Sequence, residues 1–369
     1  MSSIRVTTWI VIIMSLMLLP LAAACSRTAT GPMTFKVEAG AEDTAQGLEV
    51  NAFLPGNLTI DVGDTIEFRI ESHEPHTITF NAPSPLPDAF LVDADGRLLA
   101  NPEVFLASAT VTGTPASSGV SARLAAQFDG AAYVNSGVLQ NPGDTFSVTF
   151  TKAGSYAYTC LLHPDIMKGT ITVNSAGTSY TKMQKDYDKE AAVSLAKHKT
   201  DAKVFFDSIN VPAPATASDG TRTFTVFAGA MDDVHGNDFM HFFGGENLTI
   251  KVGDKVTWSV EKNGPGTPHT ITFLSGGSEP DLIAPELQPS GPPKLVLNPK
   301  VVEPSPLPPA PYSGTGYYNS GLIIKGGPMP QTYTLTFTKA GTYAYICILH
   351  NDDGMKGTIT VSPSGGQGY

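Results

Sequence analysis

Short runs of alternating hydrophobic and polar residues, separated by Gly, Pro, Asn and Asp, cover most of the chain. Residues 58–60 alternate before the turn at residues 62–64, and the same period of two runs through residues 149–160. A period of two places one face of a strand in a core, and clusters of turn residues bound such strands. The pattern therefore predicts a chain built mainly of β-strands.

One segment departs from this pattern, because its apolar residues recur at helical spacing between lysines and acids. The apolar positions are Tyr180, Met183, Tyr187, Ala191, Leu195, Ala202 and Phe206. The spacing predicts one amphipathic helix over residues 179–206 that packs against a domain. Thr178 or Ser179 is expected to cap its start, and Pro212 and Pro214 to prevent its continuation.

The second half of the chain repeats the first. Residues 35–64 match residues 224–254 with one residue inserted near Gly245, and HTITF occurs at residues 76–80 and again at 269–273. Further shared segments are NSG at 135–137 and 319–321, TFTKAG(S/T)YAY(T/I)C(L/I)LH at 149–163 and 336–350, and MKGTITV at 167–173 and 355–361. Self-similarity of this kind indicates a duplicated domain.

The repeat sets the expected organisation of the 369 residues. We expect a signal peptide at 1–25, a short tether at 26–33, domain one at 34–174, a helical connector at 175–221, domain two at 222–361 and a tail at 362–369. Residues 83–121 and 280–311 fall at corresponding places in the two repeats. They are expected to form long loops over one end of each β-sandwich.

The N-terminal segment has the features of an export signal. Arg5 precedes an apolar run at residues 9–19, then Pro20 and a small-residue stretch that ends at Cys25. This end is similar to a lipobox, which predicts lipidation of Cys25. The protein is then held at the outer face of the cytoplasmic membrane or in the periplasm. An uncleaved anchor and plain secretion remain alternatives.

Charge and cysteine content narrow the function further. The formal net charge of −11 argues against nucleic acid and favours basic redox partner proteins. Of three cysteines, Cys25 belongs to the signal, while Cys160 and Cys347 occupy matching places, one in each repeat. An unpaired thiol in an oxidising compartment needs protection or a metal ion.

Each repeat brings a cysteine together with two histidines and a methionine. The candidate metal ligands are His76, Cys160, His163 and Met167 in the first repeat and His269, Cys347, His350 and Met355 in the second. A thiolate, two imidazoles and a weak thioether form a type 1 copper site, which binds Cu(I) and Cu(II) with little rearrangement. Two copper ions are therefore expected. The alternatives are buried structural thiols, and methionines that only fill the core.

These motifs give each repeat a resemblance to cupredoxins of the plastocyanin and azurin family. The resemblance implies an all-β fold of two cupredoxin-like Greek-key β-sandwich domains joined by the amphipathic helical connector. It also implies copper at one end of each sandwich, with His163 and His350 exposed as electron ports.

Two features depart from the family pattern. Three residues separate His163 from Met167, whereas four separate His350 from Met355 as in plastocyanins, so the first site is expected to differ in geometry or potential. Thr77 and Thr270 stand where the family often has asparagine, and a threonine hydroxyl is expected to donate the bracing hydrogen bond.

Several polar residues lie outside these ligand sets. His73 is expected to be a solvated loop residue, and His198 a packing or surface residue of the helix. Domain two also contains a set of possible metal ligands. They are expected to be unconnected residues, and a second metal site in domain two is the alternative. The set is Met231, Asp232, Asp233, His235, Asp238, Met240 and His241.

The resulting functional prediction is an electron-transfer protein of the cell envelope that is not an enzyme. A copper-holding or delivery protein is one alternative, and a nitrite reductase or multicopper oxidase is another. Those enzymes couple the type 1 site to catalytic copper through a histidine next to the type 1 cysteine and through paired histidines. Here Thr159 and Leu161 flank Cys160, Ile346 and Ile348 flank Cys347, and no His-x-His occurs.

Overall fold

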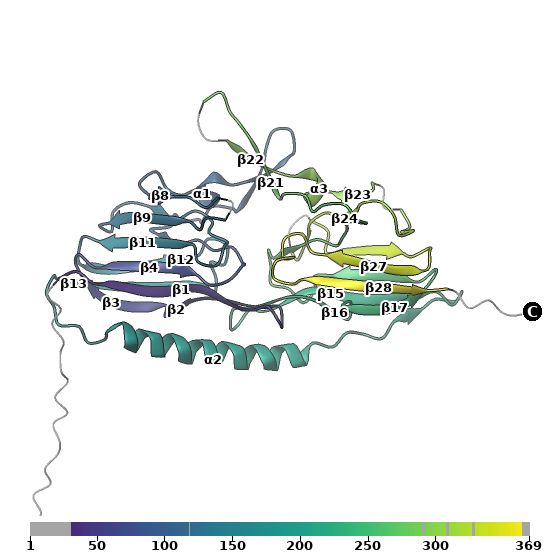
Figure 1. The fold of residues 1–369 in the computed structure, drawn as a ribbon, viewed down its shortest axis with the longest axis horizontal. Helices are drawn as coiled ribbons and strands as arrows, with labels where there is room; N and C mark the ends of the chain where they lie inside the picture. Colours follow the sequence, from purple (N-terminus) through teal and green to yellow (C-terminus); the bar gives the residue numbers. More distant parts are fainter. Residues whose placement is uncertain (1–30, 118, 291–292, 308–309, 327–328, 364–369) are drawn as a thin grey trace, which may run out of the picture.

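The computed structural model describes residues 31–117, 119–290, 293–307, 310–326 and 329–363 and consists mainly of β-strands (Figure 1). The all-β prediction is confirmed. The expected signal peptide, Cys25 and most of the expected tail lie outside the described residues. Within the described ranges, no helix is both long and apolar enough to cross a bilayer.

The strands follow one another in two groups. Those of the first half are β1 (Thr34–Asp43), β2 (Leu48–Leu54), β3 (Asn57–Asp61), β4 (Thr65–Ile70), β5 (Thr79–Phe80), β6 (Phe90–Val92), β7 (Leu98–Ala100), β8 (Thr112–Thr114), β9 (Arg123–Phe128), β10 (Val134–Asn135), β11 (Thr145–Phe150), β12 (Gly154–Thr159) and β13 (Lys168–Asn174). Those of the second half are β14 (Ala215–Thr216), β15 (Arg222–Asp232), β16 (Asn237–Phe243), β17 (Asn247–Lys251), β18 (Lys255–Ser259), β19 (Pro268–His269), β20 (Thr272–Phe273), β21 (Ile283–Glu286), β22 (Lys294–Leu297), β23 (Pro304–Ser305), β24 (Tyr318–Ser320), β25 (Ile323–Ile324), β26 (Thr332–Thr336), β27 (Gly341–Ile346) and β28 (Lys356–Ser362). The helices are α1 (Pro102–Phe105), α2 (Gln184–Ser208) and α3 (Pro299–Val302).

Each half is a β-sandwich with its own core. In the first half, the sheet β2-β1-β4-β11-β9-β8 packs on β10-β5-β12-β13-β3, and in the second half β16-β15-β18-β26 packs on β17-β28-β27-β20-β24-β23. The alternation seen in the sequence is the cause, since β11 buries every second side chain. Aromatic residues fill both cores, among them Phe68 and Phe80 in the first and Trp258 and Phe273 in the second.

The two sandwiches are joined edge to edge by hydrogen-bonded strands. Strand β2 pairs antiparallel with β16, with Glu49 opposite Asp238, and the two half-sheets become one continuous sheet. Glu49 and Asp238 occupy equivalent positions in the two repeats, and so do Leu99 of β7 and Val296 of β22, which also pair. Equivalent residues that face each other define a pseudo-two-fold axis between the halves.

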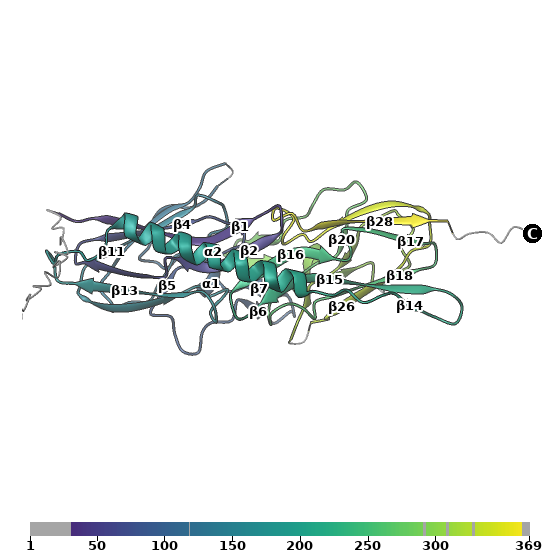
Figure 2. The ribbon, with the colours of Figure 1, turned by 90° about the horizontal axis from the view of Figure 1, so that it is seen from below.

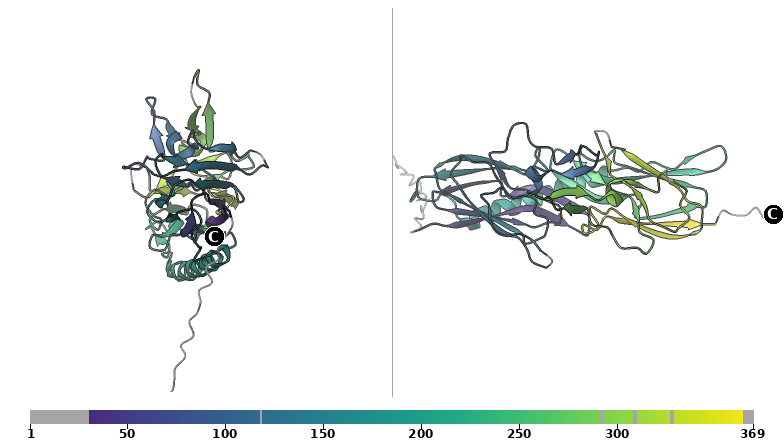
Figure 3. Two further views of the ribbon diagram at one scale, coloured as in Figure 1. Left: turned by 90° about the vertical axis from the view of Figure 1, so that its left-hand side faces the viewer. Right: turned by 90° about the horizontal axis from the view of Figure 1, so that it is seen from above.

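The two long insertions are more ordered than the loops expected from the sequence. Residues 83–121 carry β6, β7, α1 and β8, and residues 280–311 carry β21, β22, α3 and β23. Strands β21-β22-β7-β6 form a four-stranded sheet that spans both halves and stands above them in Figure 1. Seen from above, these insertions cover the junction of the two sandwiches (Figure 3).

Helix α2 lies along the face opposite the insertions and crosses the junction (Figures 1 and 2). Its Ala191 and Ala202 join a cluster with Leu48 of β2 and Phe239 of β16, so the helix packs on both halves rather than on one domain. The expected caps are wrong, because the helix begins at Gln184. There the carboxylate of Asp186 accepts a hydrogen bond from the backbone N–H of Met183.

Candidate metal centres

In each half, one strand glycine leaves space for the first histidine of the ligand set, His76 or His269. The β1–β2 ladder contains a bulge at Gly40 and the β15–β16 ladder contains one at Gly229. At each bulge the register shifts by one residue, and the extra residue lies on β2 or on β16. Both glycines have positive φ, +75° and +76°, and a Cβ at either position would overlap Nε2 of His76 or of His269. Glycine at these bulges therefore makes room for the two imidazoles.

The first centre gathers His76, Cys160 and His163, whose donor atoms lie within 4.8 Å of one another. Nδ1 of His163 is 3.7 Å from the sulfur of Cys160, and Nε2 of His76 bonds to the hydroxyl of Ser72 at 3.2 Å. Nδ1 of His76 is buried and has no hydrogen-bond partner in the described structure. A buried polar atom without a partner suits a metal ligand.

The second centre gathers His269, Cys347 and His350 in the same way. Sulfur to Nδ1 distances are 3.8 Å for His269 and 3.3 Å for His350, and the two Nδ1 atoms are 3.1 Å apart. Donors about 2.0–2.3 Å from one metal ion, at angles of about 100–120°, lie about 3.1–3.8 Å apart. Both donor sets therefore fit a single bound ion.

In each half a ligand loop runs from the cysteine to the methionine, and the methionine takes the same position in both halves although the loops differ in length. Met167 and Met355 are fully buried. The carbonyl of Met167 accepts from the N–H of Cys160, and the carbonyl of Met355 accepts from the N–H of Cys347, both at 3.0 Å. The loop with one residue fewer thus returns its methionine to the cysteine in the same register as the longer loop.

Backbone and hydroxyl groups brace each cysteine. The N–H of Thr77 donates to the sulfur of Cys160 at 3.3 Å, and that of Thr270 to the sulfur of Cys347 at 3.4 Å. The hydroxyl of Thr77 accepts from the N–H of Leu161, and that of Thr270 accepts from the N–H of Ile348. The hydroxyls thus brace the loops as acceptors, whereas the sequence led us to expect donors.

The shared NSG segments hold the histidine strands. The hydroxyl of Ser136 accepts from the N–H of Ile78, and that of Ser320 accepts from the N–H of Ile271. The amide oxygens of Asn135 and Asn319 accept from the hydroxyls of Thr79 and Thr272.

Electrostatics at the first centre favour an ionised sulfur. Burial by itself raises the pKa of the Cys160 thiol, but hydrogen bonds and positive charge from His163 and His76 outweigh it and bring the pKa well below its usual range. A thiolate is the form of cysteine that binds metal.

A single carboxylate joins the two centres. Oε1 of Glu74 lies 3.2 Å from Nε2 of His163, and Oε2 lies 3.6 Å from Nε2 of His350, in the other half of the chain. Burial by itself raises the pKa of Glu74, but the hydrogen bond from His163 and the charge of His350 hold it below its usual value. A carboxylate at the outer nitrogen orients a ligating imidazole and leaves Nδ1 for the metal.

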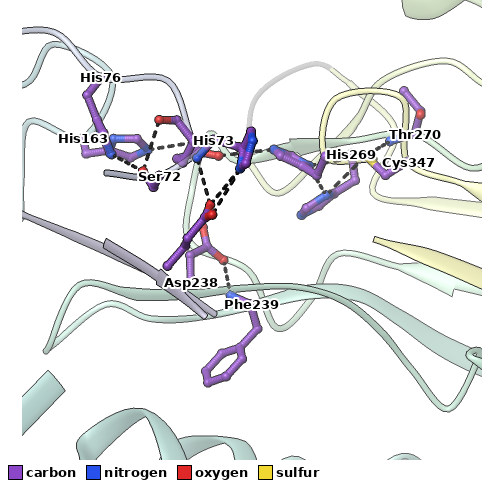
Figure 4. Close-up of polar contacts among 12 residues, drawn as sticks. Ser72, His73, His76, His163, Asp238, Phe239, His269, Thr270 and Cys347 are labelled. Carbon is purple, nitrogen blue, oxygen red and sulfur yellow. Dashed lines mark hydrogen bonds and ion pairs between the residues drawn. The ribbon is translucent and has the colours of Figure 1, made fainter. Parts of the chain in front are cut away.

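The predicted exposure of His163 and His350 is wrong. The side chain of His163 is 12% exposed and that of His350 6%. Pairing of β2 with β16 turns the two ligand ends toward each other. Figure 4 shows His76 and His163 on one side of the junction and His269 and Cys347 on the other.

Other polar residues do not behave as the sequence suggested. His73 is only partly solvated and forms an ion pair with Glu42 at 2.9 Å. His235 pairs with Asp232, and His241 with Glu246. In the described part of the chain neither joins a group of three converging donors, and Asp238 lies apart from both, at the junction. His198 on α2 contacts the amide of Asn237 and is a packing residue.

Comparisons with known proteins agree with this chemistry. A family model described as copper binding proteins of the plastocyanin/azurin family matches residues 39–174 and 314–362. Plastocyanin from Scenedesmus fuscus is 33% identical over 115 residues, which cover 31% of this chain and 81% of the relative. Plastocyanin from Solanum crispum is 27% identical over 124 residues, covering 33% of this chain and 88% of the relative.

Solved structures of amicyanin variants are also similar to this chain. One in the Cu(I) form is 23% identical and covers 42% of this chain and 97% of its own, with a TM-score of 0.21. On the family model and the plastocyanin relatives, the chain belongs to the plastocyanin/azurin family of copper-binding proteins.

The glycine bulge gives a selective test of the first centre. Gly40→Ala adds a Cβ that meets His76 and Ser72 at a strained φ, so we expect loss of copper at the first centre and about half of the visible absorption. Gly229→Ala should remove the other half. Gly96→Ala is the control for backbone strain alone, because Gly96 also has positive φ but open space around it. Equal loss in all three variants would contradict a specific role for the bulges.

The shared carboxylate makes a second prediction. Glu74→Gln keeps the shape and removes the charge, and we expect copper affinity to fall on the order of 10–100-fold at both centres. Competition with a chelator, followed separately in single-centre variants, measures each affinity. Glu71→Gln is the control, since Glu71 forms a surface ion pair with Arg69. A fall at one centre only would show that Glu74 does not serve both.

Proposed function

We propose that the chain is an exported electron-transfer protein that holds two copper ions, one in each half, and is not an enzyme. The observation that supports this most is the repeated set of one cysteine and two histidines, with its donor atoms converging in both halves. Bound copper would supply a one-electron couple between Cu(I) and Cu(II). The ligands proposed are His76, Cys160, His163 and Met167, and His269, Cys347, His350 and Met355.

The protein's own contribution is to hold these ligands still. Glycine bulges, threonine hydroxyls and the Glu74 carboxylate fix the donors before any metal arrives, and burial keeps water from the sulfur atoms. A rigid set of ligands that suits both oxidation states keeps the rearrangement on electron transfer small. Rigid burial also disfavours a copper-delivery role, which requires the ion to leave.

Copper content and colour test the proposal. After brief dialysis against a chelator, the protein is expected to retain about two coppers per chain and to be intensely blue when oxidised. Cys160→Ser should remove about half of the colour, and Cys347→Ser the other half. A colourless copper complex would contradict type 1 sites, and turnover of nitrite or dioxygen would contradict a pure carrier.

The proposed location is the outer face of the cytoplasmic membrane or the periplasm, with a lipid on Cys25 and basic redox partner proteins. The lipobox-like sequence and the acidic net charge support it. Cys25→Ser is expected to move the exported protein from the membrane fraction to the soluble fraction. A wild-type protein that is itself soluble after export would contradict the lipid anchor.

A further inference from the structure

Five carboxylates meet where the two halves join, between the two centres. They are Glu42, Glu49, Glu74, Asp238 and Asp353. All except Glu42 are buried, with exposed fractions of 2% for Glu49, 7% for Glu74, 1% for Asp238 and 2% for Asp353. Among the described residues, no lysine or arginine forms an ion pair with any of them. So much buried negative charge needs a compensating cation or protons.

The positions of these acids increase the need for a compensating cation or protons. Glu49 and Asp238 stand directly opposite each other in the β2–β16 pair, where like charges destabilise a sheet. Burial and the charges of Asp353 and Glu74 raise the pKa of Glu49 well above its usual value. Burial and Glu74 raise the pKa of Asp238 to about 7.

Three of these side chains have a carboxylate oxygen without a hydrogen bond. Oε2 of Glu49, Oε2 of Glu74 and Oδ1 of Asp353 are buried and have no hydrogen-bond partner in the described structure, and Oε2 of Glu74 has only its longer contact with His350 at 3.6 Å. Buried polar atoms are nearly always satisfied, and exceptions point to a bound water or ion.

Donors suited to a cation converge at this place. One carboxylate oxygen each of Glu42 and Asp353 and one nitrogen of His73 lie within 4.8 Å of one another. Glu42 comes from the end of β1, His73 from the loop after β4, and Asp353 from the ligand loop of the second half. In Figure 4, His73 is labelled between the two centres, with Asp238 below it.

We propose that Glu42, His73 and Asp353 form a third metal site, which shares no ligand with the copper centres but lies next to His350 of the second one. It binds a divalent transition-metal cation of the Zn²⁺ type and joins the two halves. Two carboxylates and one imidazole are a donor set that Zn²⁺ accepts. The cation offsets the charge of Glu49 and Asp238 beside it. Because its ligands come from both halves, its binding stabilises their junction.

Zn²⁺ binding to the copper-loaded protein tests this site. The chelator-dialysed protein with both coppers in place is titrated with Zn²⁺, and bound metals are counted by mass spectrometry. Copper binds more strongly than zinc to such ligands, so Zn²⁺ does not replace it. We expect one further Zn²⁺ per chain with unchanged visible absorption, and at least a tenfold loss of Zn²⁺ affinity in Glu42→Gln and in Asp353→Asn.

Asp352→Asn is the matched control, because Asp352 is an exposed neighbour in the same loop and joins no donor group. It should retain the additional Zn²⁺. Glu42 is on β1 and not itself part of a ligand loop, so Glu42→Gln still tests the site if Asp353→Asn disturbs Met355.

The outcomes separate this site from the copper centres. No further Zn²⁺, or Zn²⁺ bound equally well by both variants, overturns the proposal and leaves protonated carboxyls to compensate the charge. If the protein is not blue but Glu42→Gln still lowers its Zn²⁺ affinity, the type 1 centres are contradicted and the third site is supported.

Discussion

The antiparallel pairing of β2 with β16 is the contact on which the rest of the structure depends. It joins one sheet of each sandwich into a continuous sheet, gives α2 a surface that spans both halves, and brings the two ligand ends face to face. Without this pairing, Glu74 could not reach His350, nor could Asp353 reach Glu42 and His73. The polar chemistry of the junction is therefore a product of strand pairing rather than of either sandwich alone.

Each centre is also built by contacts that lie entirely within its own half. A bulge glycine clears space for the early histidine, a threonine backbone N–H points at the sulfur, and its hydroxyl holds the ligand loop. The methionine carbonyl accepts from the cysteine N–H in both halves. Such backbone contacts tolerate a change in loop length, which explains why the shorter loop of the first half retains the same register.

The sequence predicted what depends on local spacing. The β class, the duplicated organisation and the convergence of His76, Cys160 and His163 followed from alternation and repeated motifs. Glu74 and Asp353 were missed because the contact of Glu74 with His350 and those of Asp353 with Glu42 and His73 form only when the halves meet, and no periodicity records them. One signal was present: the histidine strands read HEPH at 73–76 but GTPH at 266–269. The unmatched acid and histidine marked the place where the halves differ.

The errors have different causes. His163 and His350 were expected to be exposed because the comparison was with a single domain, and the second domain covers them. The cap of α2 was misplaced because Thr178 and Ser179 are good caps by type, whereas the helix starts where Asp186 can accept from Met183. Thr77 has the predicted bracing role, but its hydroxyl accepts because the loop offers it an N–H.

The unequal sequences at the junction matter for its symmetry. A true two-fold dimer of the first half would bring two copies of Glu74 to the junction, related by the axis, and each would add a buried charge. In this chain the equivalent position is Thr267, so one carboxylate serves two histidines. Because the two copies are linked in one chain, their sequences can differ, and an odd number of charges can lie at the pseudo-two-fold axis. A homodimer of identical halves always brings such charges in pairs.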